Sequence, residues 1–461
     1  MARSKSRPES AQLVTNAVAH ATANWTAGTR VCVALSGGLD SMVLLHALAA
    51  LRADEPAAWR LTAHHVHHGL SPNADAWAAH CESVCASLSV PLTVERVTVD
   101  QHAGTGIEAA ARDVRLASLA RVNADVVVFA HHARDQAETL LLQLLRGSGP
   151  AGMAAMPVTA GRFVRPLLAV PKAALLTYAQ QFALRWVEDE SNLDDRFSRN
   201  RLRHRIWPAL TAAFPAAEAT LFRVAQLQAE ASLLLDDLAQ IDAATCVFDN
   251  TLRLPIFNAL TSERRANLLR FWLHDNGIGA PAADTLREWL KQLGSSSAVQ
   301  AIELRGGKPS SVIRVYRGHA FLAHDAQPWQ PCPWTGEASL QLKNNDLTVG
   351  QINFVPTVQN SQNNSVAVLR APQASERWLI RSRRDGDGLA LSERSGHVAL
   401  KNIFQQADIP PWLRSTWPLL TCNDEIVSVV SIATAKAFTV ATAEAGVRCE
   451  WKPVWSPTPG S

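Results

Sequence analysis

The sequence has few cysteines, little net charge and no long apolar segment, and each absence excludes a class of protein. Its seven cysteines are scattered through 461 residues without a Cys-x-x-Cys pair, which argues against a zinc ribbon and a disulfide framework. No apolar run is long enough to span a bilayer, and the basic start of the chain is not followed by the apolar segment of a signal peptide. We therefore expect a soluble protein in the reducing environment of the cytoplasm.

The charge balance limits how the chain can bind nucleic acid. The net charge is only +3, so any nucleic-acid surface has to be local rather than spread over the molecule. The length suggests two or three domains, and the hydrophobic content of 47% is ample for packed cores.

Residues 31–51 combine a buried strand, a glycine turn and the start of a helix. In such a turn, backbone N–H groups can approach phosphate oxygens, and the helix N-terminus adds a partial positive charge. The candidate phosphate ligands are Ser36, Gly37, Gly38, Leu39, Asp40 and Ser41. Asp40 can also hold a metal ion that bridges phosphates. A tight strand-to-helix turn without a ligand is the alternative for an isolated glycine pair.

The pattern SGGxDS differs from the GxxxxGK[ST] loop because no lysine follows the glycines. It resembles the pyrophosphate loop of the ATP pyrophosphatase family, whose members split ATP into AMP and pyrophosphate. The resemblance implies that ATP is a substrate.

Strands and helices alternate over the first 145 residues. Strands are predicted at 31–35, 61–66, 92–99 and 125–130, and helices at 13–24, 42–51, 71–88, 107–122 and after His132 to about 145. The helix that follows the second strand is expected to begin at Ser71 and Pro72. This alternation predicts a doubly wound parallel sheet, in which ligands bind at the carboxyl ends of the strands. The glycine turn, the histidines at 64–68 and residues 131–139 are expected on that rim.

The helix after His132 is expected to present two carboxylates on one face. Asp135 and Glu138 are three residues apart, whereas Leu141, Leu144 and Leu145 are expected to pack on the sheet. Two carboxylates beside a phosphate loop suit Mg²⁺ or a substrate ammonium group, and a solvated helix face is the alternative. Arg112 either binds phosphate or forms an ordinary ion pair with Glu108, four residues earlier.

Two basic clusters suit contacts with RNA phosphates, with a solvated helix surface as the alternative. The first lies among aromatic residues and contains Arg196, Arg199, Arg201, Arg203 and Arg205; the second contains Arg381, Arg383 and Arg384. From composition and periodicity we expect an α/β domain at 1–215, a mostly helical domain at 216–325, a connecting segment at 326–375 and a small α+β domain at 376–461.

Together these stretches closely resemble the tRNA(Ile)-lysidine synthetase family in its longer, three-part form. The matching segments, in order, are SGGLDS (36–41), HVHHGL (65–70), GIEAAARDVR (106–115), AHHARDQAET (130–139), LLRGSG (144–149), RPLL (165–168), EDESN (188–192), RNRLRH (199–204) and residues 400–420. The match is strong over about 30–210 and 376–420. His67 and Ser71 depart from it, at places often held by Asn or Asp and by Arg.

The resemblance implies a two-step ligation. The wobble cytidine of a CAU-anticodon tRNA(Ile) attacks the α-phosphate of ATP, and the ε-amine of free L-lysine then attacks C2, which gives lysidine, AMP and pyrophosphate. The anticodon would then read AUA instead of AUG. The implied partners are ATP, Mg²⁺, L-lysine and this tRNA, without a membrane; a homodimer is the oligomer considered.

The resemblance also implies roles for individual residues. Asp40 and Asp135 would hold Mg²⁺, and Arg112 would stabilise charge on the α-phosphate. Asp135 and Glu138 would bind lysine, and His132 would transfer a proton, because a free ε-amine has a pKa of about 10.4. The helical domain and the C-terminal domain would bind the tRNA body through the basic clusters.

Three other functions fit the sequence less well. The tRNA thiolation enzymes that act on cytidine carry CxxC motifs, which this chain lacks. Relatives of GMP synthetase or asparagine synthetase need an ammonia source, and no glutaminase domain is recognisable. A non-catalytic RNA- or nucleotide-binding protein with a degenerate loop is disfavoured because Ser36, Asp40, Asp135 and Glu138 are all intact.

Overall fold

The structure is a computed structural model that describes residues 6–54, 59–99, 107–190, 194–248, 250–279, 281–295, 300–303, 311–324, 329–344, 347–359, 368–373, 375–391, 397–441 and 443–453. The chain divides into two compact units, Met1–Leu234 and Leu235–Ser461. The four domain ranges expected from the sequence stay a prediction.

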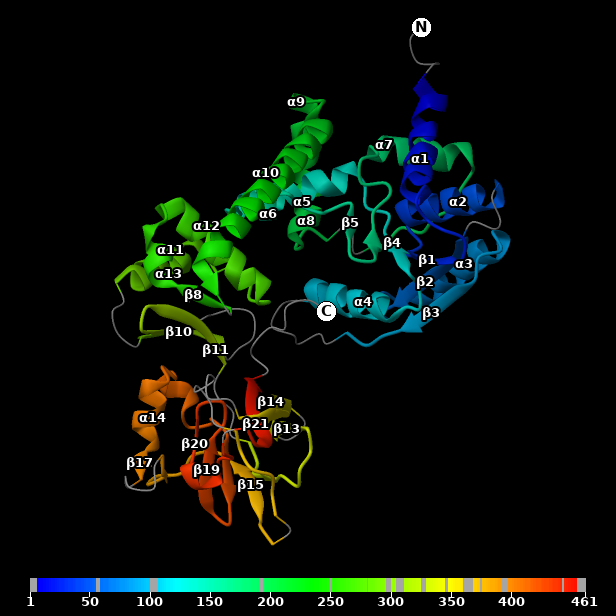
Figure 1. Ribbon diagram of the computed structural model, residues 1–461. Coiled ribbons are helices and arrows are strands. Elements are labelled where there is room, and N and C mark those ends of the chain that lie inside the picture. The colour runs from blue at the N-terminus through cyan, green and yellow to red at the C-terminus, as the bar shows by residue number, and fades with distance from the viewer. Residues whose placement is uncertain are drawn as a thin grey trace. The chain divides into compact units, whose positions relative to one another are not determined.

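The N-terminal unit is built on a six-stranded sheet with the order β3-β2-β1-β4-β6-β5 (Figure 1). Its strands are β1 (Thr29–Ala34), β2 (Trp59–His67), β3 (Leu92–Arg96), β4 (Val126–Val128), β5 (Thr159–Ala160) and β6 (Phe163–Val164). All neighbours pair in parallel except β5 and β6, which form an antiparallel edge. The predicted doubly wound parallel sheet is confirmed, and the short β5–β6 edge is an addition to it.

Helices precede, connect and follow these strands. They are α1 (Ser6–Thr22), α2 (Leu39–Asp54), α3 (Ala74–Ser87), α4 (Ile107–Arg121), α5 (Ala133–Leu145), α6 (Pro150–Met153), α7 (Lys172–Gln181), α8 (Ser198–Arg201) and α9 (Trp207–Ala213), with a π-helix, η2 (Leu202–Ile206), between α8 and α9.

Two local predictions are wrong. Helix α3 begins at Ala74 rather than at Ser71, because the Ser71 hydroxyl accepts the Asn73 N–H at 3.1 Å and forms a turn before the helix. Leu144 and Leu145 do not pack on the sheet but are 55% and 73% exposed, since they occupy the last turn of α5, next to the exposed Arg146 and Gly147.

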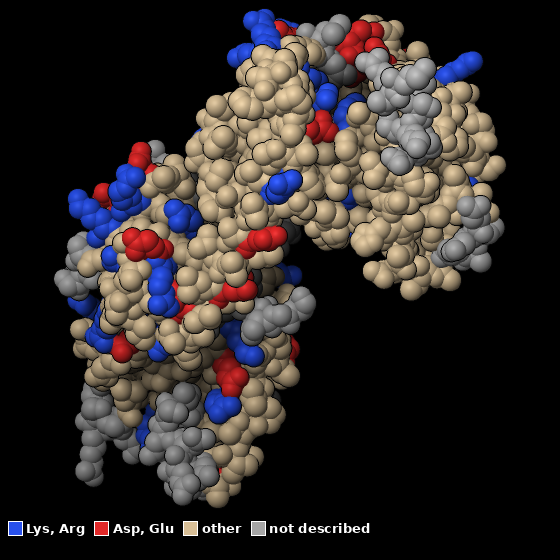
Figure 2. Space-filling view, turned by 90° about the horizontal axis from the view of Figure 1, so that it is seen from above, with Lys and Arg blue, Asp and Glu red and all other residues tan. Residues whose placement is uncertain are grey.

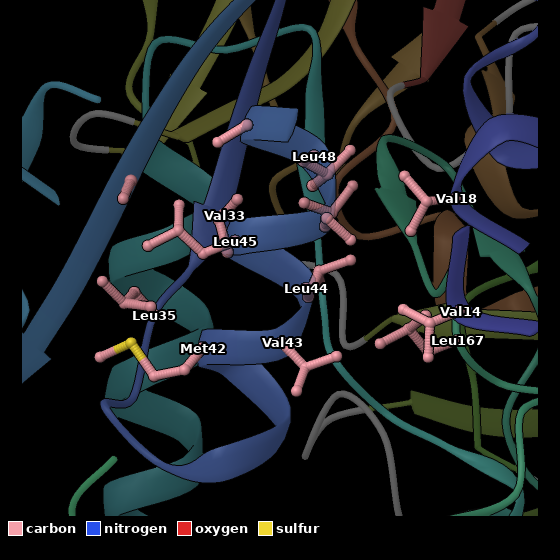
Figure 3. Packing of buried hydrophobic residues seen from close by; sticks show 14 of the residues in the cluster. Val14, Val18, Val33, Leu35, Met42, Val43, Leu44, Leu45, Leu48 and Leu167 are labelled. Carbon is pink, nitrogen blue, oxygen red and sulfur yellow. The ribbon is translucent and has the colours of Figure 1, made fainter. Parts of the chain in front are cut away.

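Burial fixes the position of the turn between β1 and α2. Figure 3 shows Val33 of β1 and Leu35 lying close to Met42 and Leu45 of α2, and α1 contributes Val14 to the same core. These side chains are almost completely buried. Each large one stabilises the fold by about 1.5–3 kcal/mol relative to an exposed position. The residues of the turn are therefore held between two anchored elements.

The strand order places two loops next to each other. The chain passes from β1 to β2 and β3 on one side, and β4 then pairs with the other side of β1. The loops after β1 and β4 consequently meet where the winding direction reverses, which is the usual ligand site of doubly wound sheets. They carry the glycine turn and His131–His132.

The second unit begins with helices and an antiparallel sheet. The helices are α10 (Ala217–Cys246), whose first part belongs to the N-terminal unit, α11 (Leu254–Ala259), α12 (Ser262–Asp275) and α13 (Ala283–Ser295). The sheet has the order β7-β8-β11-β10-β9, with β7 (Val247–Phe248), β8 (Thr251–Arg253), β9 (Gln300–Glu303), β10 (Ser311–Tyr316) and β11 (His319–His324). The sequence predicted a mostly helical region here; the helices are present, and the five-stranded sheet is an addition to them.

The last part of the chain is α+β, as predicted. One sheet has the order β12-β15-β18-β19-β20, a second is β13-β14-β21, a third is β16-β17, and one helix, α14 (Leu400–Gln406), accompanies them. The strands are β12 (Cys332–Pro333), β13 (Ser339–Asn344), β14 (Leu347–Val358), β15 (Trp378–Arg381), β16 (Gly388–Leu389), β17 (Val398–Ala399), β18 (Leu419–Cys422), β19 (Glu425–Val429), β20 (Ala433–Thr434) and β21 (Ala445–Pro453).

The expected connecting segment, 326–375, takes part in these sheets. Strand β12 pairs with β15, and β14 pairs with β21 from Gly350–Pro453 to Val358–Ala445. The hydrogen-bonding partner of β14 is about a hundred residues away in the sequence, so local patterns do not reveal the pairing.

The surface shows no single continuous basic area on the face drawn in Figure 2, where Lys and Arg side chains lie among Asp and Glu side chains. This agrees with the small net charge. Over the described part of the chain, none of the helices combines the length and apolar character needed to cross a membrane.

Candidate active site

The glycine turn after β1 is closely packed and closed by its own hydroxyl groups. Gly37 has a φ of +88°, and a Cβ atom there would lie 2.9 Å from Val187 Cγ2, so this position needs glycine. The Val187 N–H donates to the Gly37 carbonyl at 3.0 Å. The Ser41 hydroxyl donates to the Gly38 carbonyl at 2.9 Å and lies 3.1 Å from the Ser36 hydroxyl. The turn is thus preformed at the N-terminus of α2.

Asp40 lies in the first turn of α2 and contacts two groups that come from distant segments. Its Oδ1 atom accepts a hydrogen bond from the Lys172 ammonium group, and its Oδ2 atom is 3.5 Å from His132 Nε2. Burial by itself raises the pKa of the Asp40 carboxyl, but His132 and Lys172 outweigh this effect and lower the pKa to about 2. Asp40 is therefore a carboxylate at neutral pH.

His132 caps α5 and joins the two loops. Its Nδ1 atom accepts the Asp135 N–H at 3.3 Å, and its own backbone N–H donates to Asp135 Oδ2 at 3.0 Å, which is a reciprocal capping box. The Nε2 atom lies 3.4 Å from Asp135 Oδ2 as well as near Asp40. Since Nδ1 is an acceptor, the neutral ring carries its proton on Nε2, between the two carboxylates.

Asp135 and Glu138 share a face of α5, as predicted, and two arginines cover that face. Arg199 donates to Asp135 Oδ1 and to Glu138 Oε2, both at 2.8 Å. Arg203 donates to both carboxylate oxygens of Glu138, at 3.0 and 2.8 Å. Glu138 is fully buried. Burial raises the pKa of Asp135, and the charges of His132, Arg199 and His131 outweigh burial and lower it.

A second group of cationic side chains surrounds His131. Burial lowers the pKa of His131 to about 3, and the charges of Arg165, Arg199 and Arg115 add to that effect against the opposing charge of Asp135. The Nδ1 atom of His131 and the Nε atoms of Arg115 and Arg165 are buried, and they have no hydrogen-bond partner among the described residues. Buried polar atoms without partners are costly, so a polar group that reaches these nitrogen atoms would bind there favourably.

Arg112, the arginine predicted to act at the α-phosphate, is exposed on α4, one turn before Arg115. Its charge contributes to lowering the pKa of both Arg115 and Arg165, which burial lowers most. The side chain of Glu108 lies outside the described residues, so the alternative ion pair with Arg112 stays untested. Arg112 thus lies at the exposed edge of this group of cationic side chains, and Arg115 is less exposed.

The first basic cluster divides into an inner and an outer set. Arg199 and Arg203 form the inner set on Asp135 and Glu138. Arg196, Arg201 and Arg205 form the outer set: Arg196 has 88% of its side chain exposed beside Asp194, while Arg201 and Arg205 contact Asp195. The π-helix η2 widens the backbone between the inner Arg203 and the outer Arg205, and π-turns inside helices often occur at functional sites.

The second basic cluster also divides. Arg381 is buried and donates to both oxygens of Asp387, at 2.7 and 2.9 Å. Arg384 is exposed, and Arg383 is partly buried. Arg384 is therefore better placed than Arg381 to meet a phosphate group.

Sequence reasoning missed three side chains of this site, Lys172, Arg115 and Arg165. Arg115 and RPLL at 165–168 lay inside motifs that were quoted, but their burial could not be read from spacing. Lys172 is the first residue of α7 after Pro171, and that helix was not predicted. The proline followed by KAALL was the available signal, since proline is common at helix starts.

The oxygen donors of Asp40 and Asp135 are of the kind that Mg²⁺ prefers, and Mg²⁺ commonly uses one or two carboxylates together with substrate phosphates. The two carboxylates approach the same His132 nitrogen, at 3.5 and 3.4 Å. Within the described ranges, no group of three or more His, Cys, Asp and Glu side chains is arranged to hold a metal ion.

The fold and the turn define a PP-loop ATP-binding protein, and residues 9–210 match the family described as the PP-loop domain. Residues 252–321 match the TilS substrate binding domain, and residues 379–451 match the TilS substrate C-terminal domain. The chain belongs to the tRNA(Ile)-lysidine synthase family, as the following relatives show.

Three proteins named tRNA(Ile)-lysidine synthase are similar over most of their length. The one from Nitrosomonas europaea is 37% identical, with 92% of each chain covered. The one from Chromobacterium violaceum is 40% identical, with 92% of this chain and 95% of the relative covered. The one from Escherichia coli O157:H7 is 39% identical, with 92% and 96% covered.

Proposed function

We propose that the chain joins L-lysine to C2 of the wobble cytidine of a CAU-anticodon tRNA(Ile), at the expense of ATP, with lysidine, AMP and pyrophosphate as products. The family membership supports the reaction. The observation that carries the proposal is the meeting of the glycine turn, His132, Asp135 and the cationic side chains at the reversal point of one sheet. ATP, tRNA and lysine all have charged groups that this arrangement can bind.

The first step is adenylation of the cytidine oxygen. Backbone N–H groups of the turn at 36–41 bind the leaving pyrophosphate, as helix N-termini bind anions. Arg115 and Arg165 are partly buried near His131, and their Nε atoms, which have no partner among the described residues, supply donors for the charge on the α-phosphate. Arg112 adds its positive charge from the exposed edge of this group and also stabilises the charge on the α-phosphate. Asp40 and Asp135 would hold Mg²⁺, which would offset the negative charge of the phosphates.

The second step is attack by the lysine ε-amine. Asp135, which is slightly more accessible than Glu138, attracts the ammonium group. Glu138 holds Arg199 and Arg203 beside it, because both carboxylate oxygens are occupied by their guanidinium groups. His132 Nε2 lies near Asp40 and Asp135, so its N–H can donate to these carboxylates, and after it has given up that proton Nε2 can accept one from the amine.

The tRNA is held by the exposed arginines through its phosphates. Arg196, Arg201 and Arg205 border the site, and Arg383 with Arg384 contribute from the C-terminal domain. The enzyme acts in the cytoplasm, where its tRNA substrate is found. A homodimer is retained as a prediction, and sedimentation of the purified chain would test it.

A labelled-lysine assay tests the function. The purified chain is incubated with ATP, Mg²⁺, labelled lysine and a CAU-anticodon tRNA(Ile) transcript, and the tRNA is then mildly deacylated. Label that survives, and that requires both ATP and the wobble cytidine, is the expected result. A transcript with uridine at that position is the control. Loss of all label on deacylation, or equal label in the control, would contradict the proposal.

A further inference from the structure

The glycine turn lacks the lysine that many phosphate-binding loops carry directly after their glycines. A triphosphate is a polyanion, and the turn itself supplies only backbone N–H groups, two serine hydroxyls and a carboxylate. The described structure brings a lysine to the turn from another segment. The ammonium group of Lys172 forms an ion pair with Asp40 Oδ1, and these two residues are 132 positions apart.

The backbone that carries Lys172 is fixed on both sides. The Lys172 N–H donates to Glu218 Oε1 at 3.1 Å, and Glu218 also accepts from Arg134 Nε at 3.1 Å. Two residues earlier, the Val170 carbonyl accepts the Ala133 N–H at 3.0 Å, which ties this segment to the start of α5. The lysine side chain therefore extends from an anchored position toward the glycine turn.

The side chain itself is only partly covered. Lys172 has 28% of its side chain exposed and Asp40 has 31% exposed, so the ion pair borders solvent at the N-terminus of α2. A lysine ammonium is a compact charge with three rotatable donors on a flexible stem. It can exchange the Asp40 oxygen for a phosphate oxygen without movement of its backbone.

We infer that Lys172 is a ligand of the ATP polyphosphate and takes the place of the lysine that the turn lacks. The inference rests on the proposed function, because it assumes that the turn binds ATP. In the ligand-free chain, Asp40 holds the ammonium group beside the turn. When ATP binds, the ammonium donates to oxygens of the leaving pyrophosphate and offsets the charge that develops there. A purely structural ion pair between Lys172 and Asp40 is the competing explanation.

Nucleotide binding separates the two explanations. Equilibrium dialysis of the full chain would give dissociation constants for labelled ATP, AMP and adenosine. For Lys172→Met we expect ATP affinity to fall by about 10- to 100-fold, as for loss of a charged hydrogen bond, with the adenosine affinity unchanged. Lys172→Gln is a second variant with the same expectation, in case the methionine variant does not fold. Lys291→Met, at an exposed lysine of α13, is the matched control.

Unchanged ATP affinity in the folded Lys172 variants would overturn the inference. Equal losses for ATP and adenosine would also overturn it, because they indicate a structural role. The labelled-lysine assay on the unchanged protein is scored separately. If that protein makes no lysidine but the variants lose ATP affinity selectively, the proposed function fails and the assignment of Lys172 stands.

Discussion

Two groups of ion pairs, one in each unit, differ in how far apart their partners lie in the sequence. In the C-terminal unit, Arg381 with Asp387 and Arg370 with Glu376 each join residues six positions apart, so they fasten a local turn. In the N-terminal unit, Lys172 with Asp40 and Arg199 with Asp135 join residues 132 and 64 positions apart. Ion pairs between distant segments form only when the fold brings those segments together. Several such pairs in one region are typical of a functional site, whereas an ion pair within one turn stabilises that turn.

The same two groups of side chains also differ in how many of their polar atoms have a hydrogen-bond partner. Arg381 and Asp387 pair through two parallel hydrogen bonds, and little remains for a ligand. Beside Asp135, buried nitrogen atoms of His131, Arg115 and Arg165 have no partner among the described residues. A cluster that carries more buried donors than acceptors fits an anionic substrate, whereas a closed pair fits a structural role.

The largest expected effect is on the reaction itself. Asp135→Asn removes the charge that attracts the lysine ammonium and that faces His132, so we expect lysidine formation to fall at least about 100-fold. Filter binding should give a tRNA affinity close to that of the unchanged protein. Asp387→Asn is the comparison variant, and it should keep the reaction rate of the folded protein. Full activity of Asp135→Asn would remove this carboxylate from the mechanism.

The next effect is on stability. Glu138→Ala removes the fully buried partner of Arg203 and one of the two carboxylate partners of Arg199, and we expect the free energy of unfolding to fall by about 3 kcal/mol. Denaturant unfolding measures this change. Asp284→Ala, at an exposed pair on α13, should change it by less than about 0.5 kcal/mol. Similar small losses for both variants would mean that the α5 ion pairs are not a buried network.

The third effect depends on pH. Because the pKa of Asp40 is about 2 in the folded chain, against an ordinary aspartate value of 3.8, its ionised form stabilises the fold above about pH 4, and this contribution is lost as the pH falls toward 2. The unchanged protein should exceed Asp40→Asn in unfolding free energy by about 2 kcal/mol at pH 5 through this linkage. Unfolding measured between pH 5 and pH 2.5 should show the difference shrinking; a constant difference would contradict the linkage.

The smallest effect is on the salt dependence of tRNA binding. Replacing Arg196, Arg201 and Arg205 by alanine should lower the slope of log affinity against log salt by about 0.7–0.9 for each arginine that contacts a phosphate. Arg381→Ala should lower the melting temperature without changing this slope. Fluorescence anisotropy over a salt series measures both variants. An unchanged slope in the triple variant would exclude these arginines from phosphate contact.

Local patterns predicted the parts of the site that lie within one element and its flanking turn. The strand, glycine turn and helix around Ser36–Ser41 followed from composition, and the shared face of Asp135 and Glu138 followed from helical periodicity. Local patterns do not determine the order of the strands, but the rule that ligands bind at the carboxyl ends of parallel strands was enough to bring the turn and His132 to one rim.

The rest depended on contacts between distant segments. Nothing near Lys172 in the sequence shows that it meets Asp40, because α7 is placed by its backbone bonds to Glu218 and α5. Helical spacing puts Arg199 and Arg203 on one face and Arg201 and Arg205 on another, but which face meets Asp135 and Glu138 depends on the fold. Strand β14 pairs with β21 across about a hundred residues, so its segment was expected to be a connection.

The most direct test of the proposed two-step reaction follows the α-phosphate of ATP. The chain is incubated with α-labelled ATP, Mg²⁺ and the CAU-anticodon tRNA(Ile) transcript, first without lysine and then with it. We expect label to enter the tRNA in the absence of lysine and to leave as AMP when lysine is added, with one lysine joined for each AMP released. Absence of label from the tRNA, or label that lysine does not release, would contradict an adenylated cytidine formed at this site.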